Sequence, residues 1–423
     1  MTVYHRFNSV VNDMRYNTSY PLSPSDWQKW RVSEPLSFVK DSSISLYFHI
    51  PFCKSLCKFC EYTRFHVPET AAQIRYVNTL LNDLDVFIES NPHIAKLKGL
   101  DVGGGTPTAL ELVPLKKLLV GICGRKGKFT TNDDFMPSIE GTFSTVTEEK
   151  IKVIAEYGFK RMSFGIQSIS SAFLHEYNRQ HGTIANMHRT FEWCRKYGIS
   201  CINVDIMYGF PNQSDEDIMA TVNLVGELAP EHVTVYELRT NMLDGLQPLS
   251  RDTTYRQYNK LYEAIMKMGW YGRFGRNTFS KMKVDYGVSS YLKERMVNNG
   301  AYKGFGISAQ SKSSTGIAYN ICKKFSIWDF SHVYDSFREG DIYRLPPCEM
   351  LAKYVAISGY CGEIDIGIMS SILEQDAFTL FSDEINFLLT EEYITLENNK
   401  IFITPRGFRY YGAILSLFYP SEK

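Results

Sequence analysis

The chain has 423 residues, enough for one large hydrophobic core and a smaller appended domain. Its 46 lysines and arginines balance its 46 aspartates and glutamates, so overall charge does not favour nucleic acid or an anionic membrane as a partner. The chain has no apolar run of membrane-spanning length and no signal-peptide core, and its cysteine count of nine is odd. These features argue against a secreted disulfide framework and favour a cytoplasmic protein.

The N-terminal part of the chain leads into a group of cysteines. Residues 1–40, which include "SYPLSPSDWQKW", are predicted to form an arm that could cover a cofactor site. A strand-like run at residues 45–50 follows, and Cys53, Cys57 and Cys60 then occur with C-x3-C-x2-C spacing among aromatic residues. The other six cysteines show no regular spacing, so the triplet needs an explanation of its own.

Four interpretations of the triplet compete. A disulfide would leave one thiol over, and ordinary core cysteines would be clustered only by coincidence. A zinc site would need a fourth ligand, which His49 or His66 could supply, although the usual second cysteine pair is missing. An iron–sulfur cluster on three thiolates would leave one iron without a protein ligand, open to another molecule. The spacing alone does not decide between the iron–sulfur cluster and zinc.

A glycine-rich turn follows the next predicted helix. Residues 69–93 carry apolar residues at helical intervals, and "KLKGLDVGGGTPTAL" then resembles a strand that runs into a turn. Gly103, Gly104 and Gly105 have no side chains, so a ligand can approach the backbone there. A flexible turn is the alternative. Because the glycines come directly after a strand, we expect a ligand-binding loop at the carboxyl edge of an α/β sheet.

Predicted strands and helices continue to alternate up to residue 238. The strands are expected at residues 135–141, 161–170, 200–211 and 231–238, with helices at 147–158, 183–198 and 214–230. This alternation predicts right-handed parallel βαβ units, and hence an α/β barrel or an open sheet. Glu140, Gln167 and Asp205 lie near the ends of three of these strands, so we expect them to meet at one edge of the sheet.

The motifs on these elements resemble those of a known family. "YFHIPFCKSLCKFC", "GGGTPT", "SIE", "SFGIQS", "YNRQ" and "VDIMYGFPNQ" occur in the order and spacing of the radical S-adenosylmethionine (SAM) superfamily. More narrowly, they resemble the oxygen-independent coproporphyrinogen III oxidase (HemN-like) family over about residues 40–240. The resemblance implies a partial (β/α)6 TIM-like barrel at residues 41–250, followed by a family-specific cap segment at residues 251–340.

The resemblance also implies the cofactors and their ligands. A [4Fe-4S] cluster would be held by Cys53, Cys57 and Cys60, and SAM would chelate the open iron. An electron from a donor such as flavodoxin or ferredoxin would then cleave SAM into methionine and a 5′-deoxyadenosyl radical. Family members can hold one or two SAM molecules. By residue-by-residue matching, one SAM would contact Tyr47, Gly104 and Glu140, and the other would contact Phe59, Gly105, Thr106, Gln167, Arg179 and Asp205.

The chain departs from the family pattern at two places. Tyr62 stands where coproporphyrinogen oxidases carry a further cysteine, and the stretch "YGVSSYLKERM" lacks the histidine that is usual in heme chaperones. Residues 302–311, "YKGFGISAQS", do resemble the glycine-rich loop of the family. The segment before it is predicted either to shape the substrate pocket or to be a solvated loop, through Arg273, Arg276, Lys281, Lys283, Asp285, Tyr286, Tyr291 and Arg295.

The C-terminal region, residues 341–423, reads as a separate domain. A predicted helix at residues 348–358 is followed by acidic helical stretches within 370–392. Alternating apolar residues then flank Asn398 and Asn399, which is a hairpin signal. Helices followed by such a wing predict a winged-helix-like domain. It holds six lysines and arginines against twelve aspartates and glutamates, so we expect it to cap the barrel rather than bind nucleic acid.

These observations predict a radical SAM enzyme that acts on a small molecule. Methyl or methylene transfer to an sp² carbon by paired SAM molecules ranks first, giving C-methylation or cyclopropanation, because the residues matched to two SAM molecules are present while the porphyrin and heme markers are not. Oxidative decarboxylation of coproporphyrinogen ranks second, and tetrapyrrole ring opening with methyl transfer third. A non-catalytic heme-binding chaperone is the alternative from another class.

Overall fold

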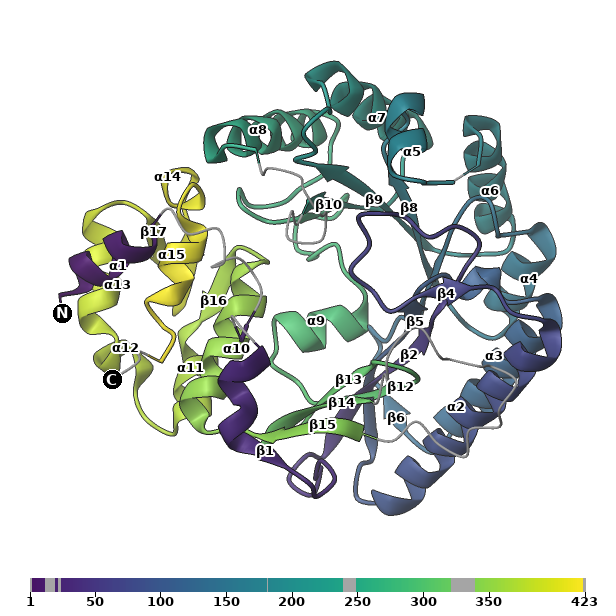
Figure 1. Ribbon diagram of the computed structural model, residues 1–423, viewed down its shortest axis with the longest axis horizontal. Coiled ribbons are helices and arrows are strands. Elements are labelled where there is room, and N and C mark those ends of the chain that lie inside the picture. The colour runs from purple at the N-terminus through teal and green to yellow at the C-terminus, as the bar shows by residue number, and fades with distance from the viewer. Residues whose placement is uncertain are drawn as a thin grey trace.

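The computed structural model describes residues 2–11, 20–21, 24–180, 182–238, 249–320 and 339–420. Figure 1 shows barrel strands surrounded by helices on one side of the molecule and a helical C-terminal domain on the other. Two large hydrophobic cores correspond to these two parts. Among the helices of the described ranges, none is both long enough and apolar enough to cross a bilayer.

Six parallel strands form the barrel, and they pair in the order in which they occur in the chain. They are β2 (Ser43–Ile50), β5 (Lys96–Gly104), β7 (Ser138–Gly141), β8 (Arg161–Gln167), β9 (Cys201–Tyr208) and β10 (His232–Glu237). The sheet does not close within the described residues. Parallel β12 (Tyr302–Phe305) extends it beyond β2, and antiparallel β11 (Thr278–Ser280) extends it beyond β10. The predicted partial (β/α)6 barrel is thus confirmed.

Helices between the strands cover the outer face of the sheet (Figure 1). They are α2 (Thr70–Ser90), α3 (Leu112–Lys126), α4 (Glu148–Glu156), α5 (Ser171–Glu176), α6 (Ile184–Lys196), α7 (Asp215–Leu228) and α8 (Arg251–Lys267). Local signals set several helix starts. The Thr147 side chain accepts a hydrogen bond from the Lys150 amide, and Ser214 and Asp217 form a capping box. The sequence reasoning missed α3, because its hydrophobic pattern lies directly after the glycine-rich motif.

The inner face of the sheet is polar. Strand register places Asp101, Ser138, Arg161 and Cys201 at one level of the barrel, and Gly103, Glu140, Ser163, Asn203 and His232 at the next level toward the carboxyl ends. Barrel interiors are usually filled by branched apolar side chains. Here most of the inward side chains are small or carry hydrogen-bonding groups, so the barrel encloses a cavity instead of a packed centre.

An antiparallel sheet continues the barrel toward the C-terminal domain. It consists of β13 (Gln310–Lys312), β14 (Gly316–Asn320), β15 (Glu339–Arg344) and β1 (Arg31–Val32). The predicted glycine-rich loop at residues 302–311 therefore comprises β12, a turn and the first residues of β13. Helix α9 (Ser290–Met296) precedes this sheet and packs against β5 and β2.

The C-terminal domain has the element order expected of a winged helix. It contains α10 (Pro347–Gly359), β16 (Glu363–Asp365), α11 (Ile366–Leu373), α12 (Ala377–Leu380), α13 (Ser382–Thr390), β17 (Ile394–Glu397), β18 (Lys400–Ile403), α14 (Pro405–Phe408) and α15 (Tyr411–Ser416). Strands β17 and β18 form the predicted hairpin. Asn398 and Asn399 have φ of 50° and 61°, so both adopt the left-handed conformation that a two-residue hairpin turn requires.

The N-terminal segment belongs to the C-terminal domain. Phe7 of α1 (Val3–Val10) and Trp27 of the 3-10 helix η1 (Pro24–Trp30) are buried in its hydrophobic core. The Tyr20 hydroxyl and the Trp27 indole nitrogen both donate hydrogen bonds to Glu349, over 2.5 and 3.0 Å. The described parts of the predicted arm at residues 1–40 thus pack on the distant C-terminal core, and Tyr20, Pro21 and Trp27 also line the cavity described below.

The segment that was predicted to shape the substrate pocket does line the cavity described below, but most of the eight residues predicted within it make other contacts. The lining residues of this segment are Asn277, Thr278, Gly287, Val288, Leu292, Arg295 and Met296. Arg273 forms an ion pair with Glu397, and Arg276 forms one with Glu363, which is almost completely buried. The Tyr286 hydroxyl also donates to Glu363. Two other members, Lys281 and Lys283, are exposed, Asp285 accepts a hydrogen bond from His232, and Tyr291 is buried against Tyr47. Of the eight residues, only Arg295 lines the cavity described below.

Candidate functional site

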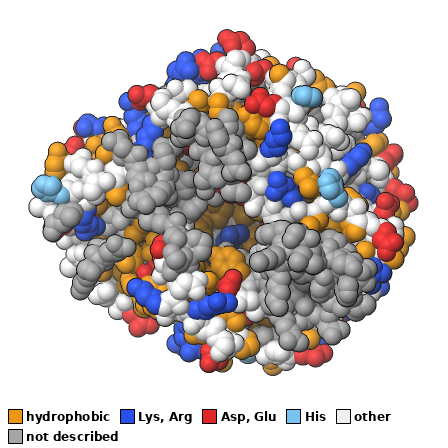
Figure 2. Space-filling model, viewed as in Figure 1, with side chains coloured by type: hydrophobic (Ala, Val, Ile, Leu, Met, Phe, Trp, Pro, Cys, Tyr) orange, Lys and Arg blue, Asp and Glu red, His pale blue; other side chains and the backbone are white. Residues whose placement is uncertain are grey.

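A cavity of about 820 Å³ opens at the carboxyl ends of the barrel strands and continues into the barrel. The space-filling view shows a hollow near the middle of the molecule (Figure 2). Its volume lies in the range that holds drug-sized ligands. Eleven of the twelve predicted site residues line it, namely Cys53, Cys57, Phe59, Cys60, Gly104, Gly105, Thr106, Glu140, Gln167, Arg179 and Asp205.

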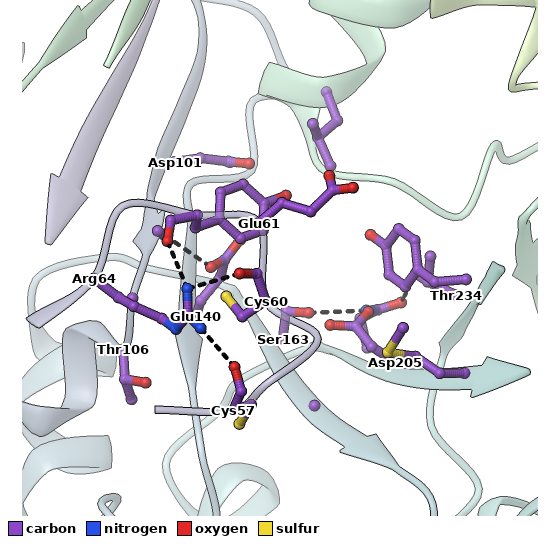
Figure 3. A pocket seen from close by; sticks show the side chains of 18 of the residues that line it. Cys57, Cys60, Glu61, Arg64, Asp101, Thr106, Glu140, Ser163, Asp205 and Thr234 are labelled. Atoms are coloured by element: carbon purple, nitrogen blue, oxygen red, sulfur yellow. Dashed lines mark hydrogen bonds between the residues drawn. The ribbon is translucent and has the colours of Figure 1, made fainter. Parts of the chain in front are cut away.

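Arg64 organises the loop that carries the three cysteines. Its guanidinium donates hydrogen bonds to the carbonyl oxygens of Cys57 and Cys60, over 2.6 and 2.7 Å (Figure 3). The Cys53 sulfur lies 3.5 Å from the Thr106 hydroxyl at the glycine-rich turn. The hydrogen bonds of Arg64 hold the loop together, and the contact between Cys53 and Thr106 attaches it to the end of β5. The three cysteines therefore lie at the cavity wall. Sequence reasoning did not single out Arg64.

The thiols lie in an environment that disfavours charge in the absence of a bound metal. Burial raises the pKa of Cys53 to about 11 and raises the pKa of Cys60 as well. The Arg179 guanidinium lies 3.7 Å from the Cys57 sulfur. Metal ligation requires thiolates, so binding of a metal centre here must displace protons from Cys53 and Cys60.

The fit of the triplet differs between zinc and an iron–sulfur cluster. His49 Nε2 donates to the Thr63 carbonyl oxygen over 2.9 Å, which occupies one candidate for the fourth zinc ligand. His66, the other, is exposed on β4 (Phe65–His66). Among the described residues, no three His, Cys, Asp or Glu side chains are arranged to hold one metal ion. A cubane cluster binds each thiolate to a different iron, so the cysteines need not converge on one point.

The glycines of the turn are required by packing inside the protein. Gly104 has φ of +110°, and a Cβ there would lie 2.4 Å from Nδ1 of His49. A Cβ on Gly103 would lie 2.7 Å from the carboxyl carbon of Glu140, and one on Gly105 would lie 2.8 Å from the Ile50 carbonyl oxygen. Ligand approach is therefore not the only reason for glycine here. The turn must also fit between β2 and β7.

Glu140 and Asp205 are carboxyl groups with raised pKa values at the cavity wall. Glu140 accepts a hydrogen bond from the Gly104 amide over 3.1 Å. Desolvation at the cavity wall raises the pKa of Glu140 to about 8, and the nearby Asp205 carboxylate raises it further. Burial also raises the pKa of Asp205, whose Oδ1 accepts from Asn203 over 2.8 Å. Both groups face the cavity, where ligand hydroxyls could bind them (Figure 3).

Gln167 and Arg179 carry polar atoms with no protein partner. Gln167 Oε1 and Arg179 Nε are buried and form no hydrogen bond within the described chain. Gln167 has φ of 66° at an irregularity in the pairing of β8 with β9. The Arg179 guanidinium donates to the Gly165 carbonyl oxygen. Such orphaned groups beside a cavity suit a ligand with complementary polar atoms, as the amino-acid part of SAM would provide.

Of the two aromatic residues predicted to contact SAM, one lines the cavity and the other does not. Phe59 is 9% exposed and packs among Phe173, Tyr177 and Phe210, with one side left on the cavity. Tyr47 does not line the cavity, and its ring stacks on Tyr291 with centroids 5.5 Å apart. The expected contact between Tyr47 and SAM therefore stays a prediction.

Several cavity residues escaped the sequence reasoning. Polar side chains on the inner face of the strands add Asp101, Ser138, Arg161, Ser163, Asn203 and Thr234 to the lining. Asn203 links three of the strands, since it donates to Ser163 over 2.9 Å and accepts from Thr234 over 3.0 Å. A sequence signal that could have found them is the alternation of polar or small residues with apolar residues along the strands. In β8 these alternating residues are Arg161, Ser163, Gly165 and Gln167.

Asp101 predicts a pH dependence of stability. Burial raises its folded-state pKa to about 7 from the ordinary value of 3.8, so the folded protein binds this proton more tightly than the unfolded chain does. The resulting stability is present below about pH 4 and is lost as the pH rises through about 7. Asp101→Asn should therefore flatten the fall in melting temperature between about pH 4 and about pH 7, and should raise the unfolding free energy at about pH 8 by roughly 2 kcal/mol.

Thermal denaturation of cofactor-free protein measures this effect. Asp85→Asn is the control, because its hydrogen bond with Arg125 lowers the pKa of Asp85 and so gives it the opposite pH dependence. Parallel melting curves for wild type and Asp101→Asn across this pH range would contradict the prediction.

Comparison with known proteins identifies the domain. The family model of the radical SAM superfamily matches residues 47–225, which span β2 to α7. Oxygen-independent coproporphyrinogen III oxidase of Cereibacter sphaeroides is 29% identical over 327 residues, which cover 72% of this chain and 70% of the relative. The heme chaperone HemW of Bacillus subtilis is 28% identical over 63% of this chain and 70% of its own length.

A solved structure matches nearly the whole fold. Coproporphyrinogen III oxidase (HemN) of Escherichia coli, described as a radical SAM enzyme, aligns with a TM-score of 0.72 over 89% of this chain and 90% of its own, at 20% identity. The similarity thus includes the C-terminal domain as well as the barrel. Residues 47–225 thus form a radical SAM domain, and the chain has homologues among the oxygen-independent coproporphyrinogen III oxidases and the HemW proteins.

Proposed function

We propose that this protein cleaves SAM reductively and uses the radical to oxidise a carboxylate-bearing tetrapyrrole of the coproporphyrinogen type. The observation that carries the proposal is the similarity to an oxygen-independent coproporphyrinogen III oxidase over 72% of the chain. A cavity at the cysteine loop with room for a large ligand supports it. The proposal assigns Cys53, Cys57 and Cys60 to a [4Fe-4S] cluster.

The residues around the cluster position SAM and exclude water. Bound at Cys53, Cys57 and Cys60, the cluster and SAM together supply a 5′-deoxyadenosyl radical after one-electron reduction by a donor such as flavodoxin or ferredoxin. Arg179 and Gln167 suit the amino-acid end of SAM. Glu140 and Asp205 suit ribose hydroxyls, and Phe59 offers an aromatic surface to adenine. The number of SAM molecules, one or two, is left to experiment.

The proposed reaction removes one hydrogen atom from a propionate side arm of the substrate. The radical takes that hydrogen and becomes 5′-deoxyadenosine. The side arm then loses carbon dioxide and one electron, and a vinyl group remains. A one-electron acceptor takes up that electron.

The relatives change the order of the sequence-based hypotheses. Methylene transfer ranked first there, but the aligned relatives are named as coproporphyrinogen oxidases and heme chaperones, so oxidation of a tetrapyrrole is now the better supported reading. Heme binding without catalysis is the second candidate, favoured by the relatives named HemW. Among the described residues, no histidine lines the cavity, whereas tyrosine, methionine and cysteine do.

Anaerobic turnover tests the proposal. Protein reconstituted with iron and sulfide, reduced and supplied with SAM and coproporphyrinogen III, should release 5′-deoxyadenosine and carbon dioxide. Methylated product with S-adenosylhomocysteine would instead support methylene transfer. A Soret band on addition of heme, without SAM cleavage, would support the chaperone. Either of these results, with no carbon dioxide released, would overturn the proposal.

A further inference from the structure

Two cavity arginines have no ion-pair partner. Arg161 on β8 is 3% exposed and Arg295 on α9 is half-buried, and both line the cavity. Neither forms an ion pair with a carboxylate in the described ranges. By contrast, Arg273 and Arg276, from the segment that precedes α9, pair with Glu397 and Glu363. The cavity therefore contains guanidinium groups that the protein itself does not neutralise by direct contact.

The direct partners of these two arginines are neutral. Arg161 donates to the Ser138 hydroxyl over 3.1 Å and to Nδ1 of His232 over 3.4 Å. His232 donates through Nε2 to Asp285, and burial lowers its pKa, so the imidazole is uncharged. Arg295 donates to Gln310 over 3.1 Å and lies over the Tyr302 ring. Burial of a cation is costly unless an anion accompanies it.

The nearest carboxyl groups reduce this charge only in part. Arg161 interacts at longer range with Asp101, Glu140 and Asp205. Desolvation at the cavity wall raises the pKa of Asp101 to about 7 and that of Glu140 to about 8, which reduces the negative charge of both groups near neutral pH. The guanidinium groups of Arg161 and Arg295 are thus only partly balanced by these carboxyl groups, which suits an anionic ligand beside them.

Asp101 offers a further polar contact. Its Oδ2 accepts a hydrogen bond from the Ser289 hydroxyl over 2.6 Å, whereas Oδ1 has no partner among the described residues. The side chain is 8% exposed, and Figure 3 shows its carboxyl group pointing into the cavity. The positive charges of Arg161 and Arg295 both act to lower the pKa of Asp101, so the three groups lie within electrostatic range of one another. A protonated Asp101 can donate to a ligand carboxylate through the unpaired oxygen.

We propose that Arg161 and Arg295, with Asp101 beside them, form a subsite that binds one carboxylate side arm of the substrate. This inference rests on the proposed function, because it assumes a substrate with several carboxylates. Arginine is suited to the role because its planar fork can bind a carboxylate through two parallel hydrogen bonds. Asp101 and Arg161 lie two residues before the level of Glu140 on their strands, so they would fix the orientation of the substrate from the inner part of the barrel.

Binding to cluster-loaded, oxidised protein with SAM and without reductant tests the inference apart from turnover. Coproporphyrin III is the probe, and its tetramethyl ester, which lacks charged carboxylates, is the matched control ligand. Arg295→Gln should weaken binding of the free acid by about tenfold to a hundredfold, the effect of one charge-assisted contact, and leave ester binding unchanged. Arg161→Gln should act in the same direction.

Arg273→Gln is the control variant, because it removes an arginine whose partner is Glu397 outside the cavity. It should bind both probes as the wild type does. Unchanged binding of the free acid to Arg295→Gln, or equal losses for acid and ester, would overturn the subsite while leaving the proposed function in place. If wild-type protein binds neither probe, the tetrapyrrole assignment fails, and the subsite fails with it.

Discussion

Cys57→Ala is expected to abolish SAM cleavage and the iron–sulfur absorption of the reconstituted protein. Cys57 is buried at the cavity wall, with its carbonyl held by Arg64 and its sulfur near Arg179. With one of three thiolates removed, a cubane cluster has two protein ligands left, and its binding free energy falls accordingly. The 5′-deoxyadenosine released under anaerobic reducing conditions should fall to the background of the assay.

Cys348→Ala is the matched control for this experiment. Cys348 is exposed at the start of α10, and it does not line the cavity. The control should retain the wild-type iron content, absorption spectrum and 5′-deoxyadenosine yield. If Cys57→Ala kept an intact cluster and full SAM cleavage, the assignment of the cluster ligands would be wrong. Zinc in place of iron in anaerobically prepared wild-type protein would contradict the assignment as well.

Gly104→Ala should cause the second largest loss, in both stability and SAM binding. The residue has φ of +110°, and a Cβ there would lie 2.4 to 2.9 Å from three atoms of the His49 ring. Left-handed strain and overpacking each cost about 1–3 kcal/mol, so a loss of roughly 2–6 kcal/mol is expected. The change would also displace the amide that donates to Glu140. Denaturant unfolding and equilibrium binding of SAM measure the two effects.

Gly124→Ala separates this site-specific effect from the general effect of adding a methyl group. Gly124 lies in α3, and a Cβ there would meet no atom within 4 Å. Alanine in a helix interior is more stable than glycine by roughly 0.5–1 kcal/mol, so this variant should gain stability and bind SAM normally. Equal stability of Gly104→Ala and the wild type would show that the turn can relax and that the predicted strain is absent.

Local sequence signals predicted most of the barrel. Thr147 and Ser214 begin helices through their own side chains, and Asn398 and Asn399 form a turn that two adjacent residues can specify. Strand–helix alternation implied parallel pairing in chain order. Because the carboxyl ends of parallel strands meet at one edge, residues on separate strands could be assigned to one site before any contact was known.

Some residues could not be placed from the sequence, because their contacts join distant parts of the chain. Tyr20 and Trp27 bind Glu349, more than 300 residues away, so the N-terminal segment could not be placed from its own composition. Arg273, Arg276 and Arg295 occur close together in the sequence, but only Arg295 reaches the cavity. Residue type and spacing do not distinguish an arginine that joins domains from one that meets a ligand.

The sequence by itself determined the radical SAM barrel, the cysteine triplet and the edge of the sheet at which a ligand would bind. These features follow from short-range periodicity and from motif order, which the chain carries locally. Only the tertiary structure decided that the barrel interior is polar, that the pKa values of Asp101 and Glu140 are raised, and that Arg161 and Arg295 form no ion pair within the described ranges. Burial and charge depend on every group packed around a side chain, and most of those groups are remote in sequence.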